Sequence, residues 1–309
     1  MYKKNFIEIE NQCDLLWGEG KLQKAVDIIE KVSSEYPEEC STINLYKALL
    51  YLDLGNIEKS VEALKDSLEK GIWYAKLSFK KAFEKEEYKE MFEAWENLRE
   101  KAQGEAKVQW IIQTPENYES GKKYPLFIAL HGWGEDAKMF AKFWNSKKVQ
   151  AEYILVMPQS SQVLSPSSFM WSNPEISHKD IKETYEKMIK EYLIDESNII
   201  VGGFSEGAMR TLDIALNHNY IPVKGFIALC PDKPETFEKK NIKTAMDNGI
   251  KGVILTGNKD GCYEEQKEIM NTFTEVGLKC EIVVKDDFGH WFPEDLDERI
   301  DNALDYILS

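Results

Sequence analysis

The sequence lacks the cysteine patterns that mark secreted scaffolds and structural zinc sites. Its cysteines are odd in number and form no C-x-x-C pair. They are Cys13, Cys40, Cys230, Cys262 and Cys280. Such spacing argues against a disulfide framework and against a zinc site, so we expect neither disulfides nor a bound metal.

Basic residues are outnumbered by acidic ones. The chain has 39 Lys and Arg residues against 54 Asp and Glu residues, which gives a net charge of −15. Nucleic acids and anionic membrane surfaces attract proteins that carry basic patches. We therefore expect neither of them as a partner.

No stretch of the sequence has the composition of a membrane span. Residues 153–174 carry no charge, but they are rich in Ser, Gln and Pro and are predicted to form a strand followed by a loop. Residues 1–17 contain too many charges for a secretory signal peptide. These absences predict a soluble protein in a reducing, cytoplasmic setting.

The first part of the chain, up to about residue 103, has a helical pattern of apolar residues. Residues 15–32 and 50–67 match at an offset of 35 residues (Gly55 minus Gly20). In each segment apolar residues precede a glycine, and a second apolar stripe follows it.

A helix, a tight turn and a second helix thus repeat at close to the period of tetratricopeptide units, roughly 34 residues. The segment resembles a degenerate tetratricopeptide array, and we assign residues 1–104 to a helical domain. Its apolar stripes are expected to form chiefly the core of a helical stack. A groove that binds a peptide or protein partner is the alternative interpretation.

The period changes after Gly104. Short apolar runs now alternate with helical stretches, which indicates an α/β domain over residues 105–309, with a mostly parallel sheet and helices on both faces. The predicted strands are 108–114, 124–130, 153–158, 198–203, 225–230, 252–257 and 280–285. Helices are expected at 178–193, from 206, at 263–276 and from about 294. Ligands of such sheets bind beyond the carboxyl ends of the strands.

A serine lies between glycines where one of these strands meets a helix. The sequence "GFSEG" (203–207) is G-x-S-x-G, and its strand–turn–helix context is that of a nucleophile elbow. Gly203 and Gly207 fit this interpretation, because in so sharp a turn a Cβ at either position would collide with the strand or the helix. The alternative is an ordinary helix start at which Ser205 acts as a cap.

A serine nucleophile needs a base, usually a histidine that is oriented by a carboxylate. Around a nucleophile elbow these residues follow the order Ser…Asp/Glu…His along the chain. His131 and His178 precede Ser205, and His218 lies at the far end of the helix that begins beside it. His290, after the last predicted strand, is therefore the predicted base.

The carboxylate should follow a strand between these two residues. Asp260 comes directly after the predicted strand 252–257. Asp232, one strand earlier, is the alternative, and Glu264 and Glu265 are weaker because a helix should have begun there. We predict that Asp260 fixes the imidazole tautomer and stabilises the imidazolium.

A fourth loop, "ALHGWGED" (129–136), follows another strand. A tetrahedral intermediate needs backbone N–H donors directed at its developing oxyanion. We assign these donors to Trp133 in this loop and to Glu206, the residue after the serine. His131 would then shape the loop and would not act as a base.

The segments "LHGWGED" and "GGFSEGAM" resemble the oxyanion and nucleophile motifs of the α/β-hydrolase superfamily, and more narrowly its phospholipase/carboxylesterase and dienelactone-hydrolase-like branches. The resemblance covers about residues 106–309. Dienelactone hydrolases carry cysteine at the elbow, so Ser205 points to an esterase. The family's acid loop reads H-G-x-x-D, and "TGNKD" has Thr256 in place of the histidine.

The resemblance implies a serine hydrolase without a cofactor that acts on carboxylic esters or thioesters. As the default we expect small-molecule carboxylic esters of short-to-medium acyl length, cleaved through an acyl-enzyme intermediate. A thioester or small-peptide substrate is an alternative, and a non-catalytic repeat scaffold is another. Residues 158–174 form the longest irregular segment expected. Trp133, Trp171 and Trp291 all fall in predicted loops, where they form either an aromatic substrate pocket or anchors of the loop core.

Overall fold

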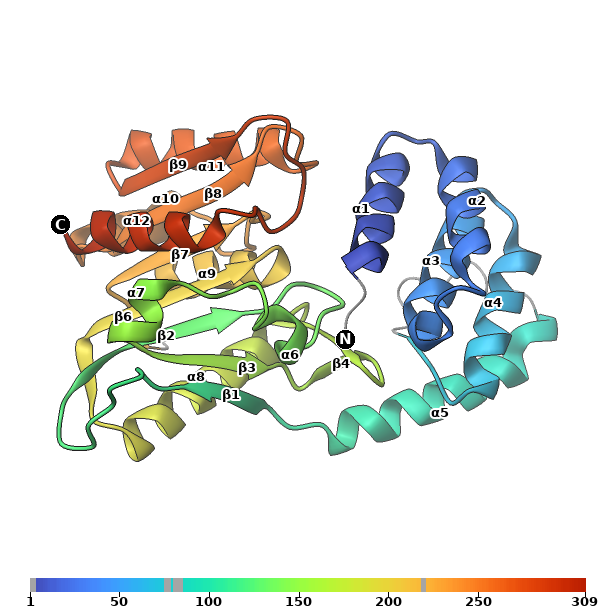
Figure 1. Cartoon of the computed structure of the whole chain (residues 1–309), viewed down its shortest axis with the longest axis horizontal. Coiled ribbons are helices and arrows are strands. Elements are labelled where there is room, and N and C mark those ends of the chain that lie inside the picture. Colours follow the sequence, from blue (N-terminus) through green and yellow to red (C-terminus); the bar gives the residue numbers. More distant parts are fainter. Residues whose placement is uncertain (1–3, 75–78, 80–85, 218–220) are drawn as a thin grey trace. The chain divides into compact units, whose positions relative to one another are not determined.

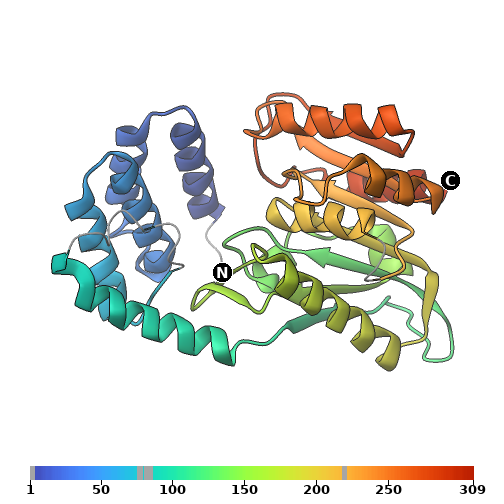
Figure 2. The same cartoon turned by 180° about the vertical axis from the view of Figure 1, so that it is seen from behind.

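The structure is a computed structural model of the chain, shown from two sides in Figures 1 and 2. It describes residues 4–74, 79, 86–217 and 221–309. His218, one of the four histidines considered above, lies outside this set. Within the described residues no helix combines the length and the apolar composition needed to cross a membrane.

The chain forms two compact units. One consists of residues 1–106 together with 163–166, and the other of residues 107–162 together with 167–309. Each unit is described separately below. The domain boundary expected from the sequence, between residues 104 and 105, stays a prediction.

The first unit is built from helices. They are α1 (Lys4–Gly18), α2 (Leu22–Val32), α3 (Cys40–Asp53), α4 (Ile57–Glu69) and α5 (Lys89–Glu105). Single turns of 3₁₀ helix precede α3 at Pro37–Glu39 and α5 at Glu86–Tyr88. Gly104, after which the sequence pattern changes, lies inside α5. Its neighbours Gln103 and Glu105 are helical as well, and one glycine is not enough to end the helix.

The helical hairpins repeat in their turns as well as in their sequence. Gly20 and Gly55 both have positive φ, +71° and +75°, which a glycine adopts without steric penalty. In both turns the next N–H donates to a carbonyl five residues earlier at 2.8 Å. These bonds run from Lys21 to Leu16 and from Asn56 to Tyr51. The 35-residue offset is therefore a repeat of backbone geometry, although membership of the tetratricopeptide class stays a prediction.

The predicted apolar stripes form the interior of this unit. Ala25, Val26 and Ile29 of α2 are buried, as are Val61 and Leu64 of α4. Their spacing of three and four residues places each set on one helix face. Packing of these faces is the main source of helix stability here.

The second unit contains a seven-stranded sheet with the order β1-β3-β2-β6-β7-β8-β9. β1 is antiparallel to β3, and all other neighbours are parallel, which confirms the predicted α/β class. The strands are β1 (Gln109–Gln113), β2 (Tyr124–Leu130), β3 (Ile154–Gln159), β6 (Ile194–Phe204), β7 (Gly225–Leu229), β8 (Lys251–Gly257) and β9 (Lys279–Lys285).

Helices cover both faces of this sheet. One face packs against α8 (Pro174–Glu191), α9 (Glu206–Leu216), α10 (Lys239–Asp247) and α11 (Tyr263–Val276). The other packs against α6 (Ala137–Phe140), α7 (Lys147–Glu152) and α12 (Leu296–Leu308). Figure 1 shows α7 and α12 in front of the sheet, and Figure 2 shows α8 and α9 on the opposite side.

Four short elements were not expected from the sequence. Two of them are strands in residues 158–174, which were predicted to be irregular: β4 (Gln162–Ser165) and β5 (Ser168–Met170) form a small sheet of their own. The other two are α6 and α7, which are each shorter than two helical turns. The longer helix α10 was not predicted either.

Candidate active site

The residues singled out from the sequence follow four different strands of the sheet. Trp133 comes after β2, Ser205 directly after β6, Asp260 after β8 and His290 after β9. Because β2, β6, β8 and β9 run in the same direction, these loops share one end of the sheet. This is the edge at which open α/β sheets bind ligands.

The turn at Ser205 explains the glycines around it. Ser205 has φ +55°, a left-handed conformation that is strained for a residue with a side chain. A Cβ on Gly203 would lie 2.7 Å from the backbone of Gly207, and one on Gly207 would lie 2.3 Å from the carbonyl oxygen of His131. Both positions therefore require glycine.

The alternative role of Ser205, that of a helix cap, does not match its contacts. The residue occupies the N-cap position of α9, but its side chain makes no capping hydrogen bond. Its Oγ lies 2.8 Å from Nε2 of His290 instead. The turn thus presents the hydroxyl to the histidine.

His290 joins Ser205 to Asp260 in one hydrogen-bonded chain. Its Nδ1 lies 3.1 Å from Oδ2 of Asp260. An ionised carboxylate can only accept, so this contact assigns the ring proton to Nδ1 and leaves Nε2 as the acceptor for the serine hydroxyl. The three side chains that the sequence analysis singled out are therefore in contact with one another.

The Asp260 carboxyl group is buried, with 6% of the residue exposed. Burial alone would raise its pKa, but the hydrogen bond and charge of His290 outweigh this effect, assisted by the Cys230 thiol and the Cys262 N–H. The pKa falls to about 2. Gln266 also donates to this carboxylate, at 3.3 Å. Asp260 is therefore ionised in this site.

The other candidate acids have different partners. Asp232 accepts a hydrogen bond from the thiol of Cys262 at 2.8 Å. Glu265 accepts from the N–H of Lys233, and Glu264 pairs with a lysine on the surface of α11. His290 contacts Asp260, which is the acid predicted from loop position.

Two sets of side chains have donor atoms close enough to share a metal ion. They are Cys230, Asp260 and His290, and Asp232, Cys262 and Glu265, searched over the residues that the structure describes. In the first set the atoms already bond to one another as described above. In the second, Sγ of Cys262 lies 2.8 Å from Oδ1 of Asp232, and burial raises the pKa of this thiol, whereas a metal requires the thiolate.

The loop after β2 surrounds Trp133. His131 is fully buried, with Nδ1 2.8 Å from the carbonyl oxygen of Gly132, and its Nε2 accepts the N–H of Ser160 at 3.3 Å. Burial lowers the pKa of His131 to about 4, so the ring is neutral near pH 7. Both ring nitrogens are engaged by the backbone, which leaves none to accept a proton from Ser205.

The backbone N–H groups of Glu206 and Trp133 remain available at this end of the sheet. Glu206 is the first residue of α9, and the N–H groups of a first helical turn have no partner within the helix. For the N–H of Trp133, no acceptor occurs among the described parts of the chain. These are the two donors assigned from the sequence.

The side chain of Glu206 has a role that the sequence did not reveal. Its carboxylate accepts the N–H of Trp171 at 2.7 Å and the hydroxyl of Ser172 at 2.5 Å. One helical turn later, Nε of Arg210 donates to the carbonyl of Trp171 at 2.9 Å. Two oppositely charged residues of α9 thus hold the Trp171–Ser172 segment against the helix that follows Ser205.

Trp171 is not a wall of an open pocket, and that interpretation of it was wrong. The residue is fully buried, and its indole N–H donates to the carbonyl of His131 at 3.0 Å. Its ring also packs beside the imidazole of His131. An indole so enclosed anchors two loops to each other, as the alternative interpretation held. Trp133, by contrast, is 42% exposed, and Trp291 is half-buried between Phe143 and Phe204.

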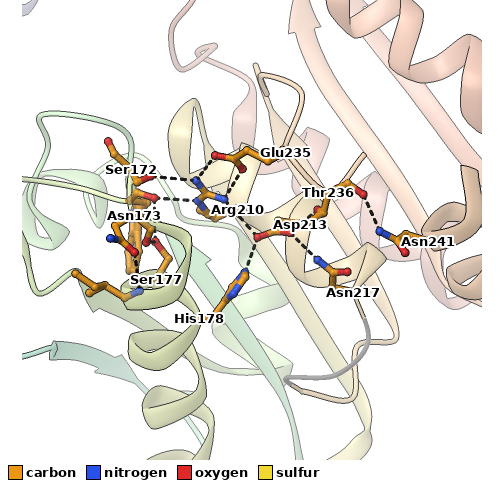
Figure 3. Close-up of polar contacts among 12 residues, drawn as sticks. Ser172, Asn173, Ser177, His178, Arg210, Asp213, Asn217, Glu235, Thr236 and Asn241 are labelled. Atoms are coloured by element: carbon orange, nitrogen blue, oxygen red, sulfur yellow. Dashed lines mark hydrogen bonds and ion pairs between the residues drawn. The ribbon is translucent and has the colours of Figure 1, made fainter. Parts of the chain in front are cut away.

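Arg210 is the centre of a buried polar network, drawn in Figure 3. Its guanidinium is fully buried and pairs with both carboxylate oxygens of Glu235 at 2.9 and 3.1 Å. Asp213 accepts from Arg210, from His178 and from Thr236. Burial tends to raise the pKa of Asp213, but these partners outweigh it and the pKa is lowered. The charges in "EGAMRTLD" were the one available sign of this network.

Comparisons with known proteins were made for the sequence and for the fold. Residues 117–247 match the phospholipase/carboxylesterase family. A comparison with curated proteins found no match. The crystal structure of an uncharacterized protein from Bacillus cereus ATCC 10987 is 27% identical, aligns over 98% of both chains and has a TM-score of 0.56.

Two esterase structures resemble the α/β unit in fold. Esterase PE8 is 17% identical and aligns over 63% of this chain and 96% of its own, with a TM-score of 0.51. A ferulic acid esterase is 17% identical and aligns over 65% of this chain and 91% of its own, with a TM-score of 0.54. The second unit has the α/β-hydrolase fold, preceded in this chain by a region of several helices.

Proposed function

We propose that the protein is a serine hydrolase that cleaves carboxylic esters of short-to-medium acyl length. The observation that carries the proposal is the hydrogen-bonded chain from Ser205 through His290 to Asp260 at one end of the sheet. The match of residues 117–247 to the phospholipase/carboxylesterase family supports the same chemistry. So do the esterases among the structures of similar fold.

In this mechanism Ser205 Oγ attacks the ester carbonyl while His290 Nε2 takes the hydroxyl proton. The imidazolium that forms is stabilised by the ionised Asp260. The N–H groups of Trp133 and Glu206 donate to the oxyanion of the tetrahedral intermediate. His290 then returns the proton to the leaving alkoxide, and an acyl group remains on Ser205.

Hydrolysis of the acyl-enzyme completes the cycle, with water as the nucleophile and Ser205 as the leaving group. His290 takes a proton from the water as it attacks the acyl-enzyme, and a second tetrahedral intermediate forms at the same N–H donors. Collapse of this intermediate returns the proton to Ser205 Oγ and releases the carboxylic acid. No bound metal or cofactor takes part in the steps proposed.

The first test is covalent labelling with a fluorophosphonate probe. Wild-type protein should be labelled at Ser205, as located by mass spectrometry, and Ser205→Ala should not be labelled. Ser172→Ala is the matched control, because Ser172 is an exposed serine in a neighbouring loop. Absence of labelling in the wild type would favour a non-catalytic scaffold.

The substrate class is tested with a panel of p-nitrophenyl esters of increasing acyl length. Thioesters and peptide anilides of matched acyl groups are compared under the same conditions. The proposal expects the highest kcat/KM for short-to-medium esters. A preference for thioesters or anilides would keep the serine mechanism and change the substrate class.

A further inference from the structure

The loop that carries Trp133 is closed by a glutamate which the mechanism does not use. Glu135 donates its N–H to the carbonyl of Gly132 at 3.4 Å, and its side-chain Oε2 accepts the N–H of Gly132 at 2.7 Å. The turn between them contains Trp133 and Gly134, and Gly134 has φ +79°. A single residue thus bonds to both backbone groups of Gly132.

These bonds determine where the Trp133 N–H points. The Gly132 carbonyl and the Trp133 N–H belong to the same planar trans peptide, so they point in opposite directions. The carbonyl is held from one side by the N–H of Glu135 and by Nδ1 of His131, 2.8 Å away. The preceding peptide plane is held by the carboxylate of Glu135. Both planes around Gly132 are therefore fixed.

The rest of the turn is braced against other parts of the same unit. Gly134 donates its N–H to the carbonyl of Phe169 at 2.9 Å, and the Phe169 N–H donates to the carbonyl of Glu135 at 3.1 Å. A Cβ on Gly132 would lie 2.9 Å from the ring of Phe204. Because the flanking residues are held so closely, the Gly132–Trp133 peptide has little room to rotate while the Glu135 bonds persist.

The burial of Glu135 argues for a role beyond packing. Only 7% of the residue is exposed, and its second carboxylate oxygen, Oε1, has no hydrogen-bond partner among the described residues. Burying a carboxyl group with an unpartnered oxygen opposes folding. Burial also raises its pKa to about 7, against the opposing effects of the Gly132 N–H and the charge of His290. An apolar residue of similar length would avoid this penalty.

We propose that Glu135 is a positioning residue for the proposed hydrolase. Its amide and its carboxylate hold the two peptide planes around Gly132 and so direct the Trp133 N–H at the carbonyl oxygen attacked by Ser205. The proposal rests on the proposed function, since it assigns the orientation of one of that reaction's two oxyanion donors. Such donors act only when they lie within hydrogen-bond distance of the oxyanion.

The test compares Glu135→Met, Glu135→Gln and Asp136→Ala with the wild type, using a soluble p-nitrophenyl ester. Met has a similar length and removes both oxygens, whereas Gln keeps an acceptor for the Gly132 N–H. Asp136 is the adjacent carboxylate, and its side chain caps α6 by accepting the N–H of Met139 at 2.6 Å. Asp136→Ala therefore weakens the same loop without touching the Gly132 turn.

Glu135→Met should lower kcat about 10- to 100-fold with KM changed less than about threefold, because a misdirected donor chiefly affects the transition state. Glu135→Gln should recover most of this loss. Asp136→Ala should lower Tm but keep kcat. A merely structural role for Glu135 would instead make kcat follow Tm across the three variants.

Three results would overturn the proposal: wild-type kcat in Glu135→Met, no recovery in Glu135→Gln, or an equal kcat loss in Asp136→Ala. Failure of the proposed function looks different. In that case the wild type itself neither hydrolyses the esters nor reacts with the fluorophosphonate probe.

Discussion

Polar side chains are buried very differently in the two units. The helices between residues 4 and 105 bury Asn44, Ser60 and Ser67, and no charged side chain is buried among the residues described there. Both serines simply donate to backbone carbonyls. The α/β unit buries six charged side chains: Glu135, Asp180, Glu206, Arg210, Asp213 and Asp260.

The buried charged side chains of the α/β unit hold other segments in place. Burial of a charge opposes folding unless partners compensate it, so such residues persist where they hold something in place. In the α/β unit Asp260 holds the ring of His290, and Glu206 and Arg210 hold the Trp171–Ser172 segment. Among the described residues of the helical unit no buried charged side chain holds another segment in this way. Equivalent substitutions in the two units should therefore have unequal effects.

The largest difference is expected between two serines. Ser205→Ala should lower ester hydrolysis by on the order of 10⁴- to 10⁶-fold, because only binding and oxyanion stabilisation remain without the nucleophile. Ser60→Ala loses one hydrogen bond to the Ala48 carbonyl and should change only stability, by about 1 kcal/mol. Steady-state kinetics and urea unfolding of both variants make the measurement. Near-normal turnover in Ser205→Ala would contradict the proposed nucleophile.

The next effect concerns two aspartates that follow neighbouring strands of the α/β unit. Asp260→Asn should lower kcat by about 10⁴-fold, because an amide cannot hold the His290 tautomer and stabilise its charge. Asp232→Asn should have a mild effect, since its carboxylate bonds to the thiol of Cys262. Reversal of these two results would move the acid to the end of β7.

Loss of the buried cation should be a large effect on stability. Arg210→Met leaves Asp213 buried without this partner and removes one of the two donors to the Trp171 carbonyl, so the free energy of unfolding should fall by about 3–5 kcal/mol. In the helical unit, Lys70→Met breaks a pair with Asp66 in which both side chains are about half exposed. That change should amount to about 0–1 kcal/mol. If denaturant unfolding showed equal losses of unfolding free energy for the two variants, the proposed difference between the units would be wrong.

The smallest predicted effect is on the pH dependence of stability. Burial raises the pKa of Glu135 from 4.5 to about 7, so between these values the folded protein holds a proton that the unfolded chain has released. Stability from this group is present below pH 4.5 and is lost as the pH rises to 7, on the order of 1–3 kcal/mol in all. Glu135→Met should remove this decline from unfolding curves measured between pH 4.5 and 8. In the helical unit, the pKa of Asp66 is lowered by its bond to Lys70, so its contribution is lost as the pH falls.

The strands of the sheet could be predicted because burial on both faces leaves a continuous apolar run, as in Ile199–Val201 of β6. The β4 and β5 strands gave no such signal. Gln162 is buried in β4 by hydrogen bonds to Ser177 and Asn173, partners that the local sequence does not reveal. Burial of such a polar side chain depends on tertiary contacts, so it leaves no periodic pattern in the sequence.

Chain order and loop position were sufficient to select Ser205, Asp260 and His290, which the structure brings into contact. They could not select the residues that hold these three in place. Gln266 reaches Asp260 from one turn inside α11, and Arg210 meets Glu235 across a separation of 25 residues. The burial of Trp171 could not be decided from the sequence either, because apolar Met170 precedes it, polar Ser172 follows it, and the direction of the loop is set by contacts with other segments.

The contact at Gly207 has a consequence for how such a site changes over time. A methyl group there would lie 2.3 Å from the carbonyl oxygen of His131 and 2.4 Å from that of Leu130, so α9 and the end of β2 touch through their main chains. Main-chain atoms are the same whatever side chains surround them. Core residues can therefore drift in size and shape while the spacing between Ser205 and the Trp133 loop is kept. Lineages built on this contact can lose most of their sequence identity before they lose the geometry of the reaction.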